Sequence, residues 1–412
     1  MAVYRYSSTA SLIRQSPARR EIEAFERWLL CQRYSAFATE CHLRRLAFVA
    51  PRIPEITLGA RLSPVRLAAA FGRERRPKSR LFCFASTRRA YERYLRAVGR
   101  LVAEPREPYA DILDQYAQYL VEVRGLSASA RAHHTQEVRL LLRRGLPRER
   151  PLAVMTRTDV ERYIQLRSRA ITRHSLQHVV AYVRAFLRFA HDHGLVAERL
   201  DGLDTPRTYR DELPPRAMPW DSVQTLLASI DPVSRCGRRD RCMLHLVAHY
   251  GLRPSEVVSL RLDSIDWPSS VLTAYQPKTR STLKLPLAPP TLQLLRDYLE
   301  QDRQRCETSA SELFLRARCP FVPLERTALG DIFKRRARAA GITGYGKHVY
   351  RLRHTVAMRL LARGVGVKAI GDVLGHHSLS GTFAYLRLDL TMLRGVALDV
   401  PYPLTGAGDH HA

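Results

Sequence analysis

The sequence of 412 residues is long enough for two or three domains, each with its own hydrophobic core. It has 67 Lys and Arg against 39 Asp and Glu, a net charge of +28. That excess is typical of nucleic-acid-binding proteins, although a basic surface without a specific partner would have the same composition. No run of 18 apolar residues and no apolar leader occur, which argues against a membrane-spanning helix and predicts a soluble, cytoplasmic protein. The seven cysteines are scattered without CxxC spacing, so we expect reduced thiols and neither a disulfide framework nor a zinc site.

The first 200 residues are predicted to be mainly helical. Residues 1–20 are polar, and we expect them to be poorly ordered. From residue 21, apolar side chains recur at three- and four-residue spacing, which is the period of an amphipathic helix. The predicted helices form two sets of four: 21–34, 38–49, 64–71 and 86–102, then 109–124, 127–144, 158–169 and 175–193.

The two sets of helices resemble each other at two turns. Residues 33–36 and 124–128, 91 residues apart, share an arginine and a Ser-Ala pair after the first helix. Residues 101–104 and 195–198, 94 residues apart, both read Leu-Val-Ala-Glu after the fourth helix. The repeat leads to the hypothesis of a duplicated four-helix module, with chance similarity between helices rich in Arg, Leu and Ala as the alternative.

A polar segment with four prolines, residues 201–219, is the predicted linker, because proline removes a backbone donor and disfavours helix. Beyond it we expect helices at 220–230 and 239–250, then a hairpin of strands 271–275 and 282–286. The expected fold is mainly α-helical with a small β-hairpin. Its expected parts are an N-terminal helical domain (1–104), a second helical domain (105–200), the linker (201–219), a third domain (220–400) and a disordered tail (401–412).

The first candidate site residue is Arg253. Gly251 is a natural cap for the helix that ends at Tyr250, and Pro254 can open the next helix. Arg253 is thereby fixed at a helix junction. For an isolated arginine in this position, a structural pair with Glu256 would be the more frequent role.

The second candidate is Lys278, at the turn of the predicted hairpin. Only six of the 67 basic residues are lysines, and Lys278 and Lys284 belong to the same hairpin. Arginine does not release its proton near neutral pH, whereas lysine can. The scarcity of lysine therefore favours Lys278 as an acid that protonates a leaving oxygen, with a plain phosphate contact as the alternative.

The third candidate segment, residues 351–354, begins a predicted amphipathic helix. Tyr350, Arg353 and Ala357 share one face of it, so Arg353 can present its fork-shaped guanidinium to phosphate oxygens. His354 lies one position round the helix, where a structural hydrogen bond is the more frequent role.

The last candidates are His376 and Tyr385. Gly375 ends a further predicted helix and holds His376 at its terminus, and Tyr385 follows nine residues later in a short helix that Thr382 can cap. Taken singly, such a histidine is usually structural, and a tyrosine among apolar neighbours usually belongs to a core.

The four segments together are more informative than any one of them. Two guanidiniums, an ammonium, an imidazole and a phenol suit a phosphodiester. The cations stabilise its non-bridging oxygens, an acid protonates the leaving oxygen, and a hydroxyl attacks. We expect covalent chemistry that needs no metal ion and no cofactor.

This ordered set resembles the catalytic domain of the tyrosine recombinases, the phage integrase family. The family pattern is an arginine in a G-L-R-x-S-E turn, a hairpin lysine, an H-x-x-R helix start, an L-G-H turn and a tyrosine nine residues on. Arg253, Lys278, Arg353, His376 and Tyr385 stand at those positions here, over about residues 215–400. Residues 105–200 resemble the family's core-binding domain, which closes the clamp around DNA, and residues 1–100 match no part of the family.

The resemblance implies a site-specific recombinase or integrase that serves a mobile element and acts on double-stranded DNA. By this resemblance Tyr385 forms a 3′-phosphotyrosyl bond, Arg253, Arg353 and His376 stabilise the transition state, and Lys278 protonates the leaving 5′ oxygen. Four protomers, identical or of two kinds, are expected on paired DNA sites. The segment 390–398 would then dock on a neighbour.

One departure from the family pattern concerns Tyr350, which stands where histidine is common. A phenol can donate a hydrogen bond to phosphate but is a poor general base near pH 7. His348, two residues earlier, is a candidate substitute. The alternatives to a recombinase are a type IB topoisomerase, which shares the chemistry, and a DNA-binding accessory recombinase with weak activity.

Overall fold

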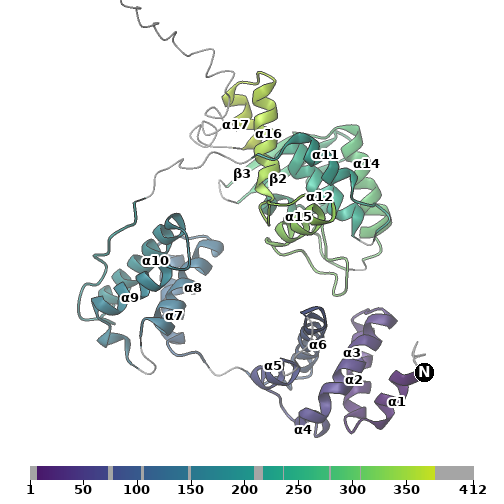
Figure 1. Ribbon diagram of the computed structural model, residues 1–412, viewed down its shortest axis with the longest axis vertical. Coiled ribbons are helices and arrows are strands. Elements are labelled where there is room, and N and C mark those ends of the chain that lie inside the picture. The colour runs from purple at the N-terminus through teal and green to yellow at the C-terminus, as the bar shows by residue number, and fades with distance from the viewer. Residues whose placement is uncertain are drawn as a thin grey trace, which may run out of the picture. The chain divides into compact units, whose positions relative to one another are not determined.

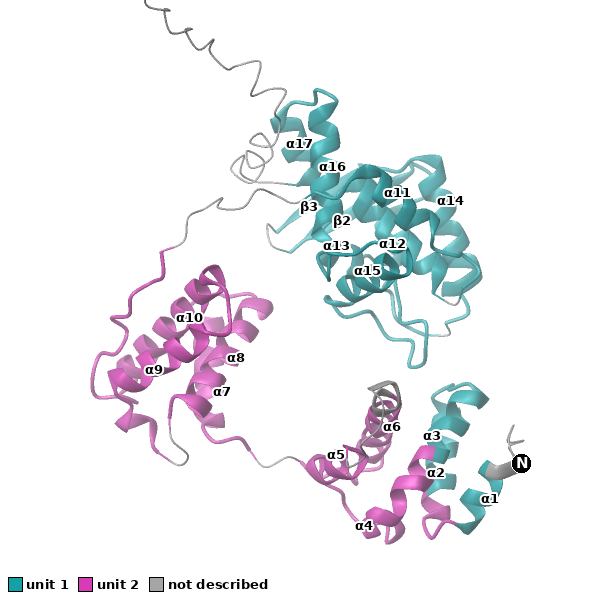
Figure 2. Ribbon diagram, in the orientation of Figure 1, with its two compact units in different colours: residues 1–15, 22–44, 213–412 teal, residues 16–21, 45–212 magenta. Residues whose placement is uncertain are grey.

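The computed structural model describes residues 7–72, 78–103, 106–146, 150–207, 217–234, 236–277, 280–306 and 308–375 (Figure 1). Its two compact units are residues 1–15, 22–44 and 213–412, and residues 16–21 and 45–212 (Figure 2). The described chain is mostly helical with one small antiparallel sheet, which confirms the expected fold class. None of the described helices combines the length and the hydropathy that crossing a bilayer requires.

The N-terminal helices depart from the sequence prediction at three places, one of them an additional short helix at residues 54–57. They are α1 (Ser7–Gln15), α2 (Arg19–Cys31), α3 (Ala36–Val49), the 3₁₀ turn Ala50–Arg52, α4 (Pro54–Thr57), α5 (Pro64–Gly72) and α6 (Lys78–Ala97). The expectation of poor order before residue 21 is wrong for α1, because Thr9 and Ile13 are buried. The prediction for α6 placed it too late in the sequence. The helix begins directly after Pro77, which cannot donate an amide hydrogen bond, and it ends before Gly99, whose φ is +70°.

The second helical set agrees with its prediction to within two residues at each end. It consists of α7 (Ala110–Glu122), α8 (Ala128–Arg144), the 3₁₀ turn Leu152–Val154, α9 (Arg157–Ser168) and α10 (Arg173–Asp192). Hydroxyl groups of Ser127, Thr156 and Thr172 cap α8, α9 and α10, which explains why the sequence located these helices well. Tyr116 and Phe186 are fully buried in the core of this set.

The segment after α10 has no regular structure but is held on that helix. Arg188 donates to the Asp201 carboxylate at 2.7 Å, and Arg184 donates to the Thr205 hydroxyl at 2.9 Å. Gln177 donates to the carbonyl of Pro206 at 2.9 Å. The beginning of the predicted linker therefore has one defined path, up to the last described residue, Arg207.

The C-terminal part holds the sheet. Its helices are α11 (Trp220–Ala228), α12 (Gly237–Tyr250), α13 (Pro254–Val258), the 3₁₀ turn Leu262–Ser264, α14 (Pro289–Tyr298) with a π-helical turn at Leu299–Arg303, α15 (Ala328–Ala339), α16 (Tyr350–Ala362) and α17 (Val367–Leu374). The strands are β1 (Ile265–Asp266), β2 (Val271–Gln276) and β3 (Ser281–Pro286), in the order β1-β2-β3 and antiparallel. The predicted hairpin is confirmed as β2–β3, and β1 is additional because two residues are too short for a detectable alternation.

Helix α12 is central to this part and packs against α11, α14, α15 and α16. Helix α12 is buried on nearly all sides and contributes fully buried apolar side chains, among them Leu244 and Val247. Near its start the fully buried carboxylate of Asp240 accepts hydrogen bonds from Arg239, Arg335 and Arg336, which fasten α15 to α12. The candidate site begins at the C-terminal end of α12.

Candidate active site

Arg253 is held at the junction of α12 and α13. Gly251 caps α12 with φ +65°, and Arg253 is the residue before Pro254, the first residue of α13. The carboxylate of Glu256, 1% exposed, accepts from the Arg253 guanidinium at 2.6 Å and from the Arg253 amide at 2.8 Å. The expected pair with Glu256 is therefore present, and it fixes the guanidinium without preventing a further contact. The other terminal nitrogen donates to the carbonyl of Gly375 at 3.2 Å.

Arg353 is the second guanidinium of the site and is 3% exposed. It lies in the first turn of α16 and donates to the carbonyls of Gly251 at 2.5 Å and Leu374 at 2.6 Å. Two arginines thus join the end of α12 to the end of α17. Arg253 and its partner Gly375 are 122 residues apart in the sequence. The Glu256 carboxylate offsets the charge of Arg253, whereas the carbonyl partners of Arg353 do not offset its charge. The centre therefore keeps a net positive charge that suits an anion.

The hairpin reaches the same centre through Gln276, at the end of β2. Gln276 is fully buried, and a Cβ atom built on Gly375 would lie 2.3 Å from its amide nitrogen. Sequence reasoning missed this residue. The available signal was the alternation of β2, in which Leu272, Ala274 and Gln276 occupy the buried face.

Three of the predicted site residues, Lys278, His376 and Tyr385, lie outside the described residues. Two of them have described residues of the centre close by in sequence: Gln276 stands two residues before Lys278, and Gly375 directly precedes His376. The structure therefore brings together Arg253, Arg353, the end of β2 and the end of α17. The roles of the remaining three residues stay predictions.

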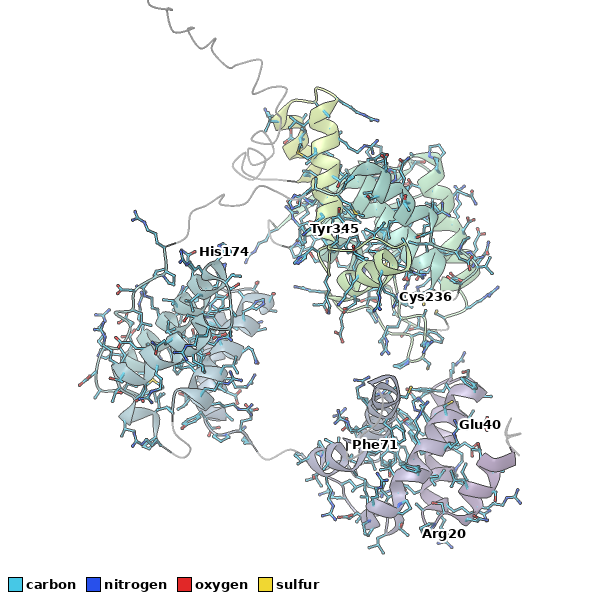
Figure 3. All side chains as sticks on the ribbon, viewed as in Figure 1. Arg20, Glu40, Phe71, His174, Cys236 and Tyr345 are labelled. Atoms are coloured by element: carbon cyan, nitrogen blue, oxygen red, sulfur yellow. The ribbon has the colours of Figure 1, made fainter. Side chains whose placement is uncertain are left out.

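Tyr350 is the first residue of α16 and is 47% exposed. It precedes Arg353 by one helical turn, as the sequence predicted. His348 lies in the exposed segment before the helix, with buried Val349 between the two. The Arg351 guanidinium covers the ring of Tyr345 at 4.8 Å from its centroid, which anchors this segment beside α16. Tyr345 is labelled in Figure 3.

The surroundings of His354 favour the uncharged form of its imidazole. Burial, followed by the charges of Arg353 and Arg351, lowers the pKa of His354. The imidazole is therefore mainly neutral at pH 7, and the structural role expected from the sequence stays a prediction.

A second polar cluster supports the Arg253 turn from α14. The hydroxyl of Tyr250 donates to Thr291 at 2.9 Å and accepts from the Ala288 amide at 3.0 Å. Nε2 of His245 lies 2.9 Å from the same threonine hydroxyl. Burial, followed by His249 and Arg241, lowers the pKa of His245 to about 4. The last turn of α12 is thus tied to the start of α14 just before Gly251.

Two parts of the chain match known families. Residues 216–391 match the phage integrase family, and residues 113–194 match the phage integrase N-terminal SAM-like domain. The first match contains Arg253, Arg353 and the three undescribed candidates. The second coincides with α7–α10.

Proteins of similar sequence have related names. The protein y4gC of Sinorhizobium fredii, named as an integrase/recombinase, is 36% identical over 191 residues, which are 45% of this chain and 96% of that protein. The protein y4rA of the same organism, with the same naming, is 31% identical over 292 residues, 70% of each protein. Tyrosine recombinase XerC of Chromobacterium violaceum is 32% identical over 56% of this chain and 75% of its own length.

The fold is also found among solved structures. A lambda integrase dimer bound to a COC′ core site matches with a TM-score of 0.52 at 17% identity, over 85% of this chain and 90% of that chain. At this identity the match establishes a common fold.

We expect Gly375→Ala to lower the free energy of unfolding more than Gly364→Ala. Both glycines have positive φ, +65° and +77°, so each alanine costs about 1–2 kcal/mol in backbone strain. A Cβ at Gly375 also meets Gln276, which adds about 1–3 kcal/mol, whereas nothing lies within 4 Å of one at Gly364. Denaturant unfolding measures both, and equal losses would contradict the contact between α17 and the hairpin.

We expect stability to fall as pH falls from 7 to 5, in part through His245. Its folded pKa of about 4 lies below the ordinary value of 6.5, so the unfolded chain takes up a proton that the folded chain excludes. The loss from this residue is up to about 2 kcal/mol. His245→Gln should reduce the pH dependence by that amount in denaturant unfolding at the two pH values. An unchanged dependence would show that His245 is protonated in the folded protein.

Proposed function

The chain belongs to the phage integrase family of tyrosine recombinases, and we propose that it cleaves and rejoins DNA strands at specific sites through a 3′-phosphotyrosyl intermediate. It is a DNA strand-transesterifying enzyme. The relatives named as integrases support a role in DNA integration and recombination for a mobile element.

The observation that carries this proposal is the pair of guanidiniums at the ends of α12 and α17. Arg253 and Arg353 come from separate helices, and both donate to carbonyls at the end of α17, those of Gly375 and Leu374. Preorganised donors of this kind stabilise charge that develops on the non-bridging oxygens of a phosphate, because they need no reorganisation during the reaction. His376, the residue after Gly375, is proposed as the third donor.

In the proposed reaction the phenol oxygen of Tyr385 forms a bond to phosphorus, and the bond from phosphorus to the 5′ oxygen breaks. Lys278 supplies the proton that the departing 5′ oxygen takes up. The 5′ hydroxyl of the partner strand then attacks the phosphotyrosine, and the tyrosine leaves with a proton. The number of phosphodiester bonds is unchanged, so no external energy source is required.

The proton of Tyr385 needs an acceptor in the first step. Tyr350, the first residue of α16, is proposed to donate a hydrogen bond to phosphate, but a phenol is a poor base near pH 7. His348 precedes it in an exposed segment and is the proposed alternative. Replacing Tyr350 and His348 in separate variants, and measuring DNA cleavage by each, distinguishes the two residues.

The clamp that the family closes around DNA is proposed to consist of residues 105–200 and 220–400, joined by the linker 201–219. The buried core of α7–α10 and the match to the SAM-like domain support the first assignment. Residues 1–104 form the proposed additional helical domain. Lambda integrase is seen as a dimer on DNA, and we propose for this chain a tetramer on paired double-stranded sites, with 390–398 docking on a neighbour.

Strand relaxation of the topoisomerase IB kind is not favoured, because the matched relatives are recombinases and integrases. An accessory recombinase with weak activity differs from an active enzyme in one observable, the covalent adduct.

We expect the wild type to accumulate a covalent adduct on a suicide substrate nicked beside the cleavage site. Tyr385→Phe should abolish the adduct and leave the affinity for DNA largely intact, because only the attacking oxygen is removed. Tyr275→Phe, which removes a phenol 58% exposed on β2, is the matched control and should form the adduct. Gel electrophoresis under denaturing conditions measures the adduct. No adduct with the wild type would leave only the accessory role.

We expect Lys278→Arg to bind DNA normally but to cleave an ordinary phosphodiester about 10²–10⁴-fold more slowly, because arginine does not release its proton. A substrate with a 5′-bridging thiol should restore cleavage, since a thiolate leaves without protonation. Lys284→Arg, in the same hairpin on β3, is the control and should cleave at the normal rate. Single-turnover kinetics measures the cleavage rate of Lys278→Arg on both substrates and of Lys284→Arg on the ordinary one. Unimpaired cleavage of the ordinary substrate by Lys278→Arg would refute the acid role.

A further inference from the structure

The N-terminal helices present one sign of charge to solvent. Within the described part of residues 7–103, every glutamate is buried or half-buried, and the first 104 residues contain no aspartate. Arginines are exposed throughout this part of the chain; they are residues 14, 19, 20, 27, 33, 44, 52, 61, 66, 89 and 96. Arg20, on α2, is labelled in Figure 3.

The second helical set has a different surface, although it is similarly rich in arginine. Exposed acidic residues occur on each of α7, α9 and α10, among them Asp111, Glu161 and Asp192. Residues 1–104 have 21 Lys and Arg against eight Glu, a net charge of +13, whereas the whole chain has +28. Nearly half of the net positive charge is therefore found in a quarter of the chain, where the described glutamates are buried or half-buried.

The order and length of the N-terminal helices repeat those of the second set. Helices α2 and α7 both have 13 residues, and their starts lie 91 residues apart. Helices α6 and α10 both have 20 residues, and their starts lie 95 residues apart. Between these two lie α3 and α5 in the first set and α8 and α9 in the second, and the first set also contains the four-residue α4, which has no counterpart.

The turns repeat as well. Ser35 and Ser127 each accept from the amide three residues on, at 3.3 Å, and cap the second helix. Ser63 and Thr156 do the same at the starts of α5 and α9, at 3.2 and 3.3 Å. After the fourth helix, Gly99 and Gly194 have φ of +70° and +67°, and the backbone hydrogen bonds around them have the same spacing.

We propose that residues 7–103 are a second copy of the helical module formed by residues 106–207 and bind the phosphate backbone of double-stranded DNA beside the cleavage site. The inference rests on the proposed function, which brings duplex DNA to the rest of the chain and so raises its effective concentration near these helices. Arginine suits this partner because its planar guanidinium donates two hydrogen bonds to one phosphate. Backbone binding of this kind is independent of sequence and falls steeply with salt.

The test compares the salt dependence of DNA affinity in full-length proteins, on a mixed-sequence duplex of about 40 base pairs, roughly four helical turns. Arg20, Arg44, Arg61 and Arg96 are exposed and are replaced together by Gln. The slope of log K against log salt should decrease by about 0.9 for each phosphate that the variant no longer neutralises, up to roughly 3.6. Fluorescence anisotropy measures the affinity, and thermal unfolding checks that the variant is folded.

The matched control removes the same charge from the C-terminal part, by replacing exposed Arg305, Arg316, Arg318 and Arg326 with Gln. A larger fall in slope for the N-terminal variant supports the proposal. An unchanged slope, or an equal fall in both variants, overturns it. The double variants R20Q/R44Q and R61Q/R96Q each should show part of the effect, and they replace the quadruple variant if that protein unfolds.

Two further outcomes are informative. If the N-terminal variant keeps the wild-type slope but no longer binds vesicles that contain anionic phospholipid, the basic surface is for a membrane and the proposal is wrong. The slope is measured without any cleavage, so it is independent of the adduct that tests the proposed function. Each idea can therefore fail while the other stands.

Discussion

The buried guanidinium of Arg353 is the interaction on which the described site depends. Removing a charge from water is costly unless hydrogen bonds replace the solvation. Arg353 obtains two of them from the carbonyls of Gly251 and Leu374, at helix ends where backbone carbonyls lack partners within their own helices. One side chain thus satisfies two helix termini and places a positive charge between them.

Charge has two separate uses in this protein. Inside the fold, a few carboxylates each hold one or more arginines: Glu256 holds Arg253, and Asp240 receives three guanidiniums between α12 and α15. These groups fix helix junctions. At the described N-terminal helices the glutamates are buried or half-buried and many arginines are exposed, which suits an extended anionic partner. Net charge alone does not separate the two uses, whereas burial does.

The helices of residues 109–193 and the β2–β3 hairpin were predictable because their signals are local. Hydroxyl caps, Gly251 and the prolines act within one turn of the chain. The predictions failed where a tertiary contact decided the outcome. Residues 7–15 are polar enough to suggest disorder, yet burial of Thr9 and Ile13 accompanies a helix there. Gln276 was missed because its importance comes from Gly375, 99 residues away, and not from its neighbours in sequence.

The sequence by itself determined the kind of chemistry. Arg253, Lys278, Arg353, His376 and Tyr385 occur in an order and spacing typical of one family, and their functional groups suit a phosphodiester. Only the tertiary structure decided how Arg253 and Arg353 are held, through Glu256 and through carbonyls at two distant helix ends. It also decided which arginines face solvent. The sequence specifies the functional group at each position, whereas burial and hydrogen-bond partners depend on segments that meet only after folding.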